Sequence, residues 1–266
     1  MASYLADAVA AGPEGVTWSA CVRDLATGEA IAAADPGAVM PAASMGKLLL
    51  LIELARQAER GELALTERLA RTPADAVADS GLWRHLDAEA LTVNDLAVLT
   101  GAVSDNLATN VLLRRVGLDR VAETARRLGL RATALHDRVR DERGPEHPPA
   151  LSSATAAELT RLFADLHAGR AISPGASERV LGWLAHGADL SMVASAMGLD
   201  PLARGADGLR HKTGADAGVR ADAGLLTGPR GGVAYAVLAR WTGRDRLSAV
   251  LAAMRAVGEA LRARVG

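Results

Sequence analysis

The chain has 266 residues, half of them hydrophobic, so it can bury one large core or the cores of two lobes. Its 30 basic and 31 acidic residues leave a net charge of −1, which gives no electrostatic reason to expect nucleic acid or an anionic membrane surface as a partner. Cys21 is the only cysteine, so an intrachain disulfide is excluded.

Targeting, metal and cofactor signals are missing from the sequence. The N-terminus lacks the basic start and apolar core of a signal peptide, and no apolar run approaches the roughly 20 residues of a membrane span. A cytoplasmic location is therefore expected for the chain as it stands, and a secreted protein remains open if a leader precedes it. We expect no metal and no cofactor, because the six histidines lack ligand spacing and no glycine-rich phosphate cradle occurs.

The first part of the chain predicts a short helix over 5–11, a hairpin over 16–24 and 30–35, and a helix over 44–60. Weak alternation on both sides of a glycine turn indicates the hairpin. In the longer helix Leu48, Leu51 and Ile52 recur at helical spacing, and Ser44 stands at its start.

The middle of the chain is predicted to be helical over 92–103, 106–117, 118–130, 153–169 and 176–187. Thr92 is the expected N-cap of the first of these helices, and Ser153 that of the fourth. The stretch 131–153 is polar, contains prolines and has no period, so it predicts a long loop. Loops of that length in a compact domain are usually functional or mobile.

The end of the chain predicts three strands and a final amphipathic helix, over 208–214, 219–227, 232–241 and 244–265. Strands near both ends with helices in between indicate an α+β fold. One antiparallel sheet would combine strands from both termini and be covered by the terminal helices, beside an all-α lobe. The expected domains are the sheet domain, 1–43 with 190–266, and the helical domain, 44–189, with an active-site cleft between them.

Lysine is rare in this sequence. Lys47 and Lys212 are the only lysines among the 30 basic residues. An ammonium can lose its proton inside a protein or act as a compact point charge, whereas a guanidinium stays protonated and spreads its charge over a flat fork. Unless they persist by chance, the two lysines mark positions where the chemistry requires an amine.

Both lysines fall within short motifs: Ser-x-x-Lys at 44–47, Ser-Asp-Asn at 104–106 and Lys-Thr-Gly at 212–214. The first motif places a hydroxyl and an amine one helical turn apart, and a serine needs a neighbouring base to become a nucleophile. Each motif alone also has an ordinary explanation as a helix cap or a strand end. All three in this order are far more specific than any one of them.

With these motifs the chain resembles the class A serine β-lactamases and penicillin-binding proteins. The resemblance runs nearly end to end, through "PAASMGKLLLLIEL", "DSGLWRHL", "LTVNDLAVLTGAVSDNLATN" and "RHKTGADAGVRADAGLL". It implies a sheet-plus-helices fold and a small-molecule substrate, a β-lactam or another amide or ester that carries a carboxylate. A monomer is expected.

The resemblance implies four catalytic residues. Ser44 would attack a carbonyl, and Lys47 would help to remove its proton. Ser104 would pass a proton to the departing nitrogen, while Lys212 would hold that hydroxyl electrostatically.

The resemblance also implies substrate-binding residues. Asn106 would bind the side-chain amide of the substrate and orient the first lysine, and Ala215, next to Gly214, would give its N–H to the oxyanion hole together with the nucleophile's own N–H. Thr213 and Arg220 would bind the substrate carboxylate. For Arg220 a solvated strand arginine is an equal alternative.

The sequence departs from the family in the loop that activates water. Class A enzymes carry Glu-x-x-Leu-Asn there, and this chain has no such motif. If the Asp-Arg pair at 137–138 matches the family's pair, the glutamate position falls on Arg140, which cannot act as a base. Other loop carboxylates could substitute or could simply be solvated: Asp141, Glu142 and Glu146.

Three functions remain open at this point. The first is a β-lactamase-like hydrolase with altered deacylation. The second is a serine esterase, amidase or acyltransferase of small-molecule metabolism. The third is a β-lactam-binding protein without turnover.

Overall fold

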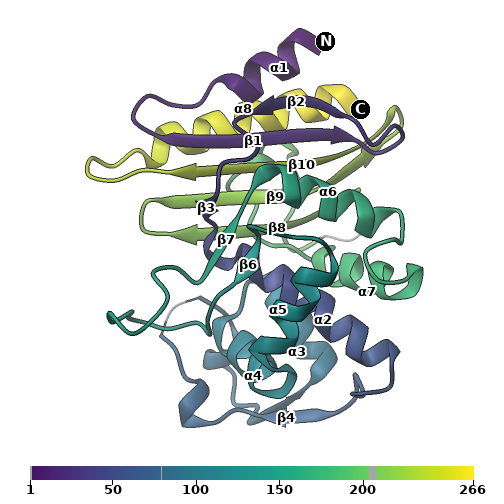
Figure 1. The fold of residues 1–266 in the computed structure, drawn as a ribbon, viewed down its shortest axis with the longest axis vertical. Helices are drawn as coiled ribbons and strands as arrows, with labels where there is room; N and C mark the ends of the chain where they lie inside the picture. Colours follow the sequence, from purple (N-terminus) through teal and green to yellow (C-terminus); the bar gives the residue numbers. More distant parts are fainter. Residues whose placement is uncertain (1, 79, 204–207) are drawn as a thin grey trace.

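The computed structural model describes residues 2–78, 80–203 and 208–266, and it confirms the predicted α+β architecture (Figure 1). A five-stranded sheet with helices on both faces forms one end of the molecule, and a group of helices forms the other. The first and last helices pack against each other. Among the described residues, no helix combines the length and apolar character needed to cross a bilayer.

The predicted N-terminal hairpin and the three predicted C-terminal strands form one antiparallel sheet of order β2-β1-β10-β9-β8. Its strands are β1 Thr17–Asp24, β2 Ala30–Ala34, β8 Leu209–Asp216, β9 Val219–Gly228 and β10 Gly231–Arg240. The hairpin joins the sheet through β1 and β10, where Cys21 lies opposite Ala236. Strand β8 forms the edge that faces the helical group (Figure 1).

Alternate residues of each strand enter two different cores, as the period of two requires. Ala20 and Val22 pack with the terminal helices, whereas Cys21 between them packs on the other side of the sheet. The first core is covered by α1 Ala2–Ala10 and α8 Leu247–Val265, and the second by α6 Ala156–His167 and α2 Lys47–Glu59. Both terminal helices therefore cover the sheet as predicted.

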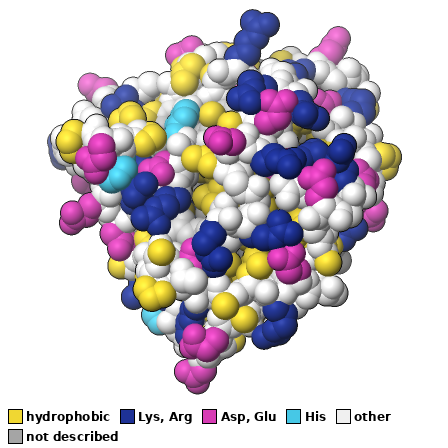
Figure 2. Space-filling view, turned by 60° about the horizontal axis from the view of Figure 1, so that its bottom comes forward, with side chains coloured by type: hydrophobic (Ala, Val, Ile, Leu, Met, Phe, Trp, Pro, Cys, Tyr) yellow, Lys and Arg dark blue, Asp and Glu magenta, His cyan; other side chains and the backbone are white. Residues whose placement is uncertain are grey.

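The helical group is built around α2, where Leu50, Leu51 and Ile52 are completely buried. Its other elements are α3 Val93–Ala102, α4 Asn106–Val116, α5 Leu118–Arg127, α7 Pro174–Leu184 and the strand pair β4 Arg68–Ala70 with β5 Ala90–Thr92. Thr92 caps α3 as predicted, since its side chain accepts a hydrogen bond from Asp95 N at 3.1 Å. Figure 2 shows basic and acidic side chains interspersed over this end of the molecule.

Two helix starts differ from the predictions. Ser44 lies in a 3₁₀ turn, Ala43–Gly46, and α2 begins only at Lys47. Helix α6 is capped by Thr155, whose side chain accepts from Glu158 N at 3.1 Å, and not by Ser153. Ser153 is unavailable as a cap because it pairs within a short strand.

The predicted loop over 131–153 is irregular in its middle, but short strands hold both ends. These strands are β6 Ala134–Leu135 and β7 Ser152–Ala154, and β7 also pairs with β3 Met40–Pro41. The loop is thereby attached to the chain just before the Ser44 turn. The domain division at 43/44 and 189/190 stays a prediction; α6, from within 44–189, packs across β1, β9 and β10.

Candidate active site

The three sequence motifs meet where the Ser44 turn, the α3–α4 connection and edge strand β8 converge. Strand β8 packs directly against the turn, because a Cβ at position 214 would lie 2.3 Å from Ala42 O and 3.2 Å from Ser44 N. Gly214 is therefore the residue that this approach allows. Ser104, between α3 and α4, completes the group.

The hydroxyl of Ser104 lies between the two lysines. Its Oγ is 3.2 Å from Lys47 Nζ and 3.0 Å from Lys212 Nζ. A hydroxyl can accept two hydrogen bonds and donate one. With both lysines donating, the proton of Ser104 stays available for a third group in the cavity.

The amine of Lys47 is held in place from the α3–α4 connection. Its side chain is fully buried, and Nζ also donates to Ser104 O at 2.6 Å and to Asn106 Oδ1 at 2.5 Å. Among the described residues, Ser44 Oγ is not an acceptor of this amine. Hydrogen bonds between a nucleophile and its base are often loose without substrate and tighten when it binds.

Lys212 is buried as well, with 2 % of its surface exposed, and Nζ donates to Thr213 O at 2.7 Å. Burial lowers the pKa of Lys212 to about 8, while the charges of Asp189 and Asp222 act in the opposite direction. The ammonium form therefore still dominates at neutral pH.

Three residues at the site have left-handed backbones. The φ angle is +47° at Ala43, immediately before the serine, +55° at Ser80 in the cavity lining and +56° at Ser104. Residues other than glycine rarely adopt such angles, and they persist where the surrounding contacts impose them, as they do at functional sites.

Small cavities of about 270 and 170 Å³ open on the two sides of Ser44. Ser44, Asn106 and Ala215 line both. The first is also lined by Ser80, Ala102, Val103, Ser104, Asp189 and Thr213, and the second by Val77, Val139, Arg140, Asp141, Arg143, Leu151 and Asp216. A substrate bound at Ser44 can thus extend toward the lysine pair on one side and toward the 131–153 loop on the other.

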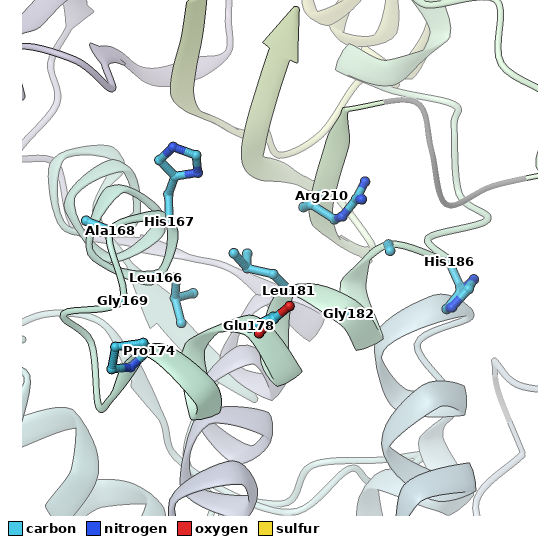
Figure 3. A pocket seen from close by; sticks show the side chains of 11 residues that line it. Leu166, His167, Ala168, Gly169, Pro174, Glu178, Leu181, Gly182, His186 and Arg210 are labelled. Carbon is cyan, nitrogen blue, oxygen red and sulfur yellow. The ribbon is translucent and has the colours of Figure 1, made fainter.

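A larger cavity of about 630 Å³ lies away from the motifs, between the end of α6, helix α7 and the start of β8 (Figure 3). Its polar side chains, His167, Glu178, His186 and Arg210, stand apart and point in different directions (Figure 3). The described lining residues include no member of the three motifs. The convergence of polar groups makes the smaller cavities at Ser44 the candidate site.

The two residues expected to bind the substrate carboxylate, Thr213 and Arg220, lie in different surroundings. Thr213 lines the cavity on the Ser104 side. The Nη1 of Arg220 donates to Asp216 O at 2.8 Å and Val219 O at 2.7 Å, and its guanidinium lies 6.0 Å from the ring centroid of Trp241. Arg220 is not among the described lining residues of either cavity, so its carboxylate contact stays a prediction that needs a different rotamer.

On the loop side, Asp137 organises the basic residues. Its carboxylate is 2.7 Å from Arg140 Nε and 2.8 Å from Arg143 Nη1. Burial favours the neutral acid, but hydrogen bonds from the two arginines keep the pKa of Asp137 below its usual value. The ion pairs thus hold Arg140 in the wall of the cavity beside Ser44.

The three candidate carboxylates of this loop are not equivalent. Asp141 lines the cavity beside Ser44, and its Oδ1 accepts from Ala78 N at 2.7 Å. Glu142 and Glu146 are exposed and are not among the described lining residues. Of the three, Asp141 is therefore the best placed to activate water, although its Oδ1 already accepts a hydrogen bond from the backbone at Ala78.

Two further residues support the site and were not predicted from the sequence. Ser152 Oγ donates to Ala43 O at 2.7 Å and accepts from Gly46 N at 3.3 Å, so it fixes both ends of the Ser44 turn. Asn110 Oδ1 accepts from Val139 N at 2.9 Å, and Asn110 Nδ2 donates to Val139 O at 3.1 Å. Asn110 therefore holds the residue before Arg140. Its place four residues after Asn106 on one helix was the available signal.

Replacing Ser152 by alanine is expected to destabilise the fold by about 1–3 kcal/mol, because buried polar groups of the turn lose their partner. Acylation of Ser44 should slow as well, since the turn is no longer fixed. Urea unfolding and a stopped-flow acylation assay measure the two effects. Ser153→Ala, on the same strand as Ser152, is the matched control. It removes the hydrogen bond that Ser153 Oγ donates to Ala132 O and should leave acylation unchanged. Equal acylation in both variants would contradict the positioning role.

Comparison with known proteins identifies the family. A family model described as the beta-lactamase enzyme family matches residues 1–265. The crystal structure of a beta-lactamase from Sphaerobacter thermophilus DSM 20745 is similar, with 31 % identity and a TM-score of 0.86, over 98 % of this chain and 97 % of that one. The chain therefore belongs to the beta-lactamase enzyme family.

Two curated relatives match part of the chain. The beta-lactamase regulatory protein BlaB of Streptomyces cacaoi is 30 % identical over 167 residues, and a beta-lactamase of Streptomyces lavendulae is 32 % identical over 170. The alignments cover 62 % and 61 % of this chain. They span about half of the relatives, 50 % and 54 % of their lengths.

Proposed function

We propose that the protein is a β-lactamase-like serine enzyme that forms an acyl-enzyme on Ser44 with a β-lactam or a related amide and releases the acyl group slowly. The observation that carries this proposal is Ser104 Oγ between the amines of Lys47 and Lys212, at 3.2 and 3.0 Å, in a cavity that Ser44 shares. Family membership and the similarity to a beta-lactamase at 31 % identity support it.

In the acylation step, the neutral form of Lys47 takes the proton from Ser44 Oγ as the oxygen attacks the carbonyl. The carbonyl oxygen becomes negative and receives the backbone N–H groups of Ser44 and Ala215. The close approach of β8 at Gly214 brings these two donors together, because a side chain there would push the strand away from Ser44 N.

In the step that breaks the amide, Ser104 gives its own proton to the departing nitrogen. Lys47 replaces that proton on Ser104 Oγ, 3.2 Å away, and so returns to its neutral form. Lys212 stabilises the negative charge that develops on this oxygen during the transfer, because its ammonium lies 3.0 Å away. The proton removed from Ser44 thus reaches the leaving group through two side chains.

Deacylation is the step for which the site is poorly equipped. If the Asp-Arg pair at 137–138 matches the family's pair, the position of the water-activating glutamate is occupied by Arg140, which lines the cavity beside Ser44. A guanidinium stays protonated and cannot act as a base. Asp141 in the same wall already accepts from Ala78 N. The acyl-enzyme is therefore expected to outlast the acylation step.

The experiment combines a chromogenic cephalosporin with intact-mass measurements over time. We expect a burst of colour stoichiometric with enzyme and a mass increase that decays slowly, whereas Ser44→Ala gives neither. Sustained rapid colour without a lasting adduct would show efficient hydrolysis and contradict slow release. No adduct and no colour would overturn the proposed function. Faster loss of the adduct on addition of a small amine would indicate an acyltransferase.

A second candidate is a β-lactam-responsive regulatory protein, which the similarity to a beta-lactamase regulatory protein favours. Such a protein needs the acylation groups and no deacylation base, which is compatible with an arginine in the cavity wall at position 140. It predicts an adduct that persists for the lifetime of the folded protein. Recovery of unmodified protein from the purified adduct distinguishes the slow enzyme from this candidate.

A further inference from the structure

Asp189 is an acidic residue of the site that belongs to none of the three motifs. It lies between α7 and the 3₁₀ turn Val193–Ala196, half-buried, and it lines the cavity that contains Ser44, Ser104 and Thr213. The cavity thus combines a carboxylate with the Ser104 hydroxyl, to which both lysines donate.

The segment around Asp189 is fixed to the site. Ala188 N donates to Ala102 O at 2.9 Å, at the end of α3 and two residues before Ser104. The carboxylate of Asp189 accepts from Ser191 N at 3.2 Å and Ser191 Oγ at 2.6 Å, and from the hydroxyl of Thr213. These contacts hold the carboxylate against β8.

Asp189 is ionised in this environment. Burial favours its neutral form, but hydrogen bonds from Ser191 and Thr213 and the nearby imidazole of His211 keep its pKa below the usual value. At neutral pH the residue therefore contributes a full negative charge to one wall of the cavity.

Among the described residues, four titratable groups surround Lys212: Lys47, His211, Asp222 and Asp189. The two carboxylates are the ones that favour its ammonium form. Lys47 of α2 lies on the other side of Ser104, with its Nζ 3.2 Å from Ser104 Oγ. Asp222 of β9 has its oxygens engaged by His211 Nδ1, Tyr235 OH and Val193 N, each at 3.0 Å, and Asp189 is the stronger attractive charge on Lys212.

We propose that Asp189 is a positioning residue of the acylation reaction: its carboxylate keeps the buried Lys212 protonated and fixes the Thr213 hydroxyl beside it, so that Lys212 continues to donate to Ser104. A buried ammonium without a counter-charge loses its proton, and a neutral amine stabilises negative charge on Ser104 Oγ far less. The catalytic part of this inference rests on the proposed function, whereas the effect on Lys212 does not.

The scarcity of lysine makes the electrostatic part directly measurable. Protein grown with ¹³Cε-lysine carries two labelled side chains, Lys47 and Lys212, and Lys47→Arg assigns the two signals. We expect the Lys212 signal to titrate with a midpoint of about 8 in the natural protein. In Asp189→Asn the midpoint should fall by about one pH unit or more.

An unchanged Lys212 midpoint in folded Asp189→Asn would overturn the proposal. Ser191→Ala is the second variant: it keeps the charge but releases the carboxylate, and it should shift the midpoint in the same direction by less. Asp165→Asn, which removes a surface carboxylate paired with Arg170, is the matched control and should shift neither lysine signal.

The pH dependence of acylation tests the catalytic part. The rate of acylation by a chromogenic cephalosporin should fall above about pH 8 in the natural protein. In Asp189→Asn the fall should begin about one pH unit lower. The ratio of the two rates should then be within about twofold at pH 6 and roughly tenfold at pH 8.5, as expected for one titrating group with its pKa shifted by about one unit. A ratio that is the same at every pH would show a packing role only and contradict the proposal.

The two parts fail in different ways. If no probe acylates the natural protein, the proposed function is wrong, and the lysine titration still decides whether Asp189 controls Lys212. If acylation occurs and the alkaline limb of its pH profile does not move in Asp189→Asn, the role of Asp189 is wrong while the proposed function stands.

Discussion

Replacing Lys47 by arginine is expected to slow acylation of Ser44 by about 10²- to 10⁴-fold, the range typical for loss of a general base. Arginine cannot give up its proton, and its wide guanidinium does not fit a fully buried site where Ser104 O lies 2.6 Å and Asn106 Oδ1 2.5 Å from the amine. Stopped-flow acylation at neutral pH measures the effect, and circular dichroism tests whether the fold is kept.

Lys47→Ala is the companion variant, because it removes the amine without adding bulk. It should lose as much acylation as the arginine variant, which separates the loss of the base from steric effects. If Lys47→Arg kept most of the acylation rate, Lys47 could not be the group that receives the proton of Ser44.

The second large effect is expected from Arg140→Glu, which places a carboxylate in the cavity wall beside Ser44. A positioned base for water should speed loss of the acyl group by about 10²-fold or more. The lifetime of the adduct, followed by intact mass after removal of free β-lactam, measures the change.

Arg140→Gln is the matched control for this experiment, since it removes the arginine without adding a base. Both variants lose the contact between Arg140 and Asp137, while Arg143 still pairs with Asp137. Equal adduct lifetimes in the Glu and Gln variants would mean that position 140 is not the water-activating position, and the proposed loop alignment would be abandoned.

Much of the fold could be predicted because local patterns and tertiary structure agree. The alternation in β1, β9 and β10 matches the two cores on either side of the sheet, and Thr92 with Asp95 marks the start of α3. The prediction was wrong at the start of α6, where pairing of β7 with β3 and β6 takes Ser153 away from its capping role.

The central contacts of the site were predictable because each motif residue brings a specific chemistry. Lys47, Ser104 and Lys212 come together as the motifs suggested. The supporting residues depend on contacts that local sequence does not encode: Ser152 binds Ala43, 109 positions away.

The position of the Arg220 side chain also depends on contacts that local sequence does not encode. Its side chain follows the carbonyls of the β8–β9 turn and the ring of Trp241, which lies at the end of a different strand. A motif places an arginine near the site, but the neighbours of the strand decide where the guanidinium lies.

The most direct measurement maps the covalent adduct by peptide mass spectrometry after brief exposure to a β-lactam. We expect a single modified peptide, the one that contains Ser44, and no modification in Ser44→Ala. An adduct on another residue, or one that persists in Ser44→Ala, would contradict the assignment of Ser44 as the nucleophile.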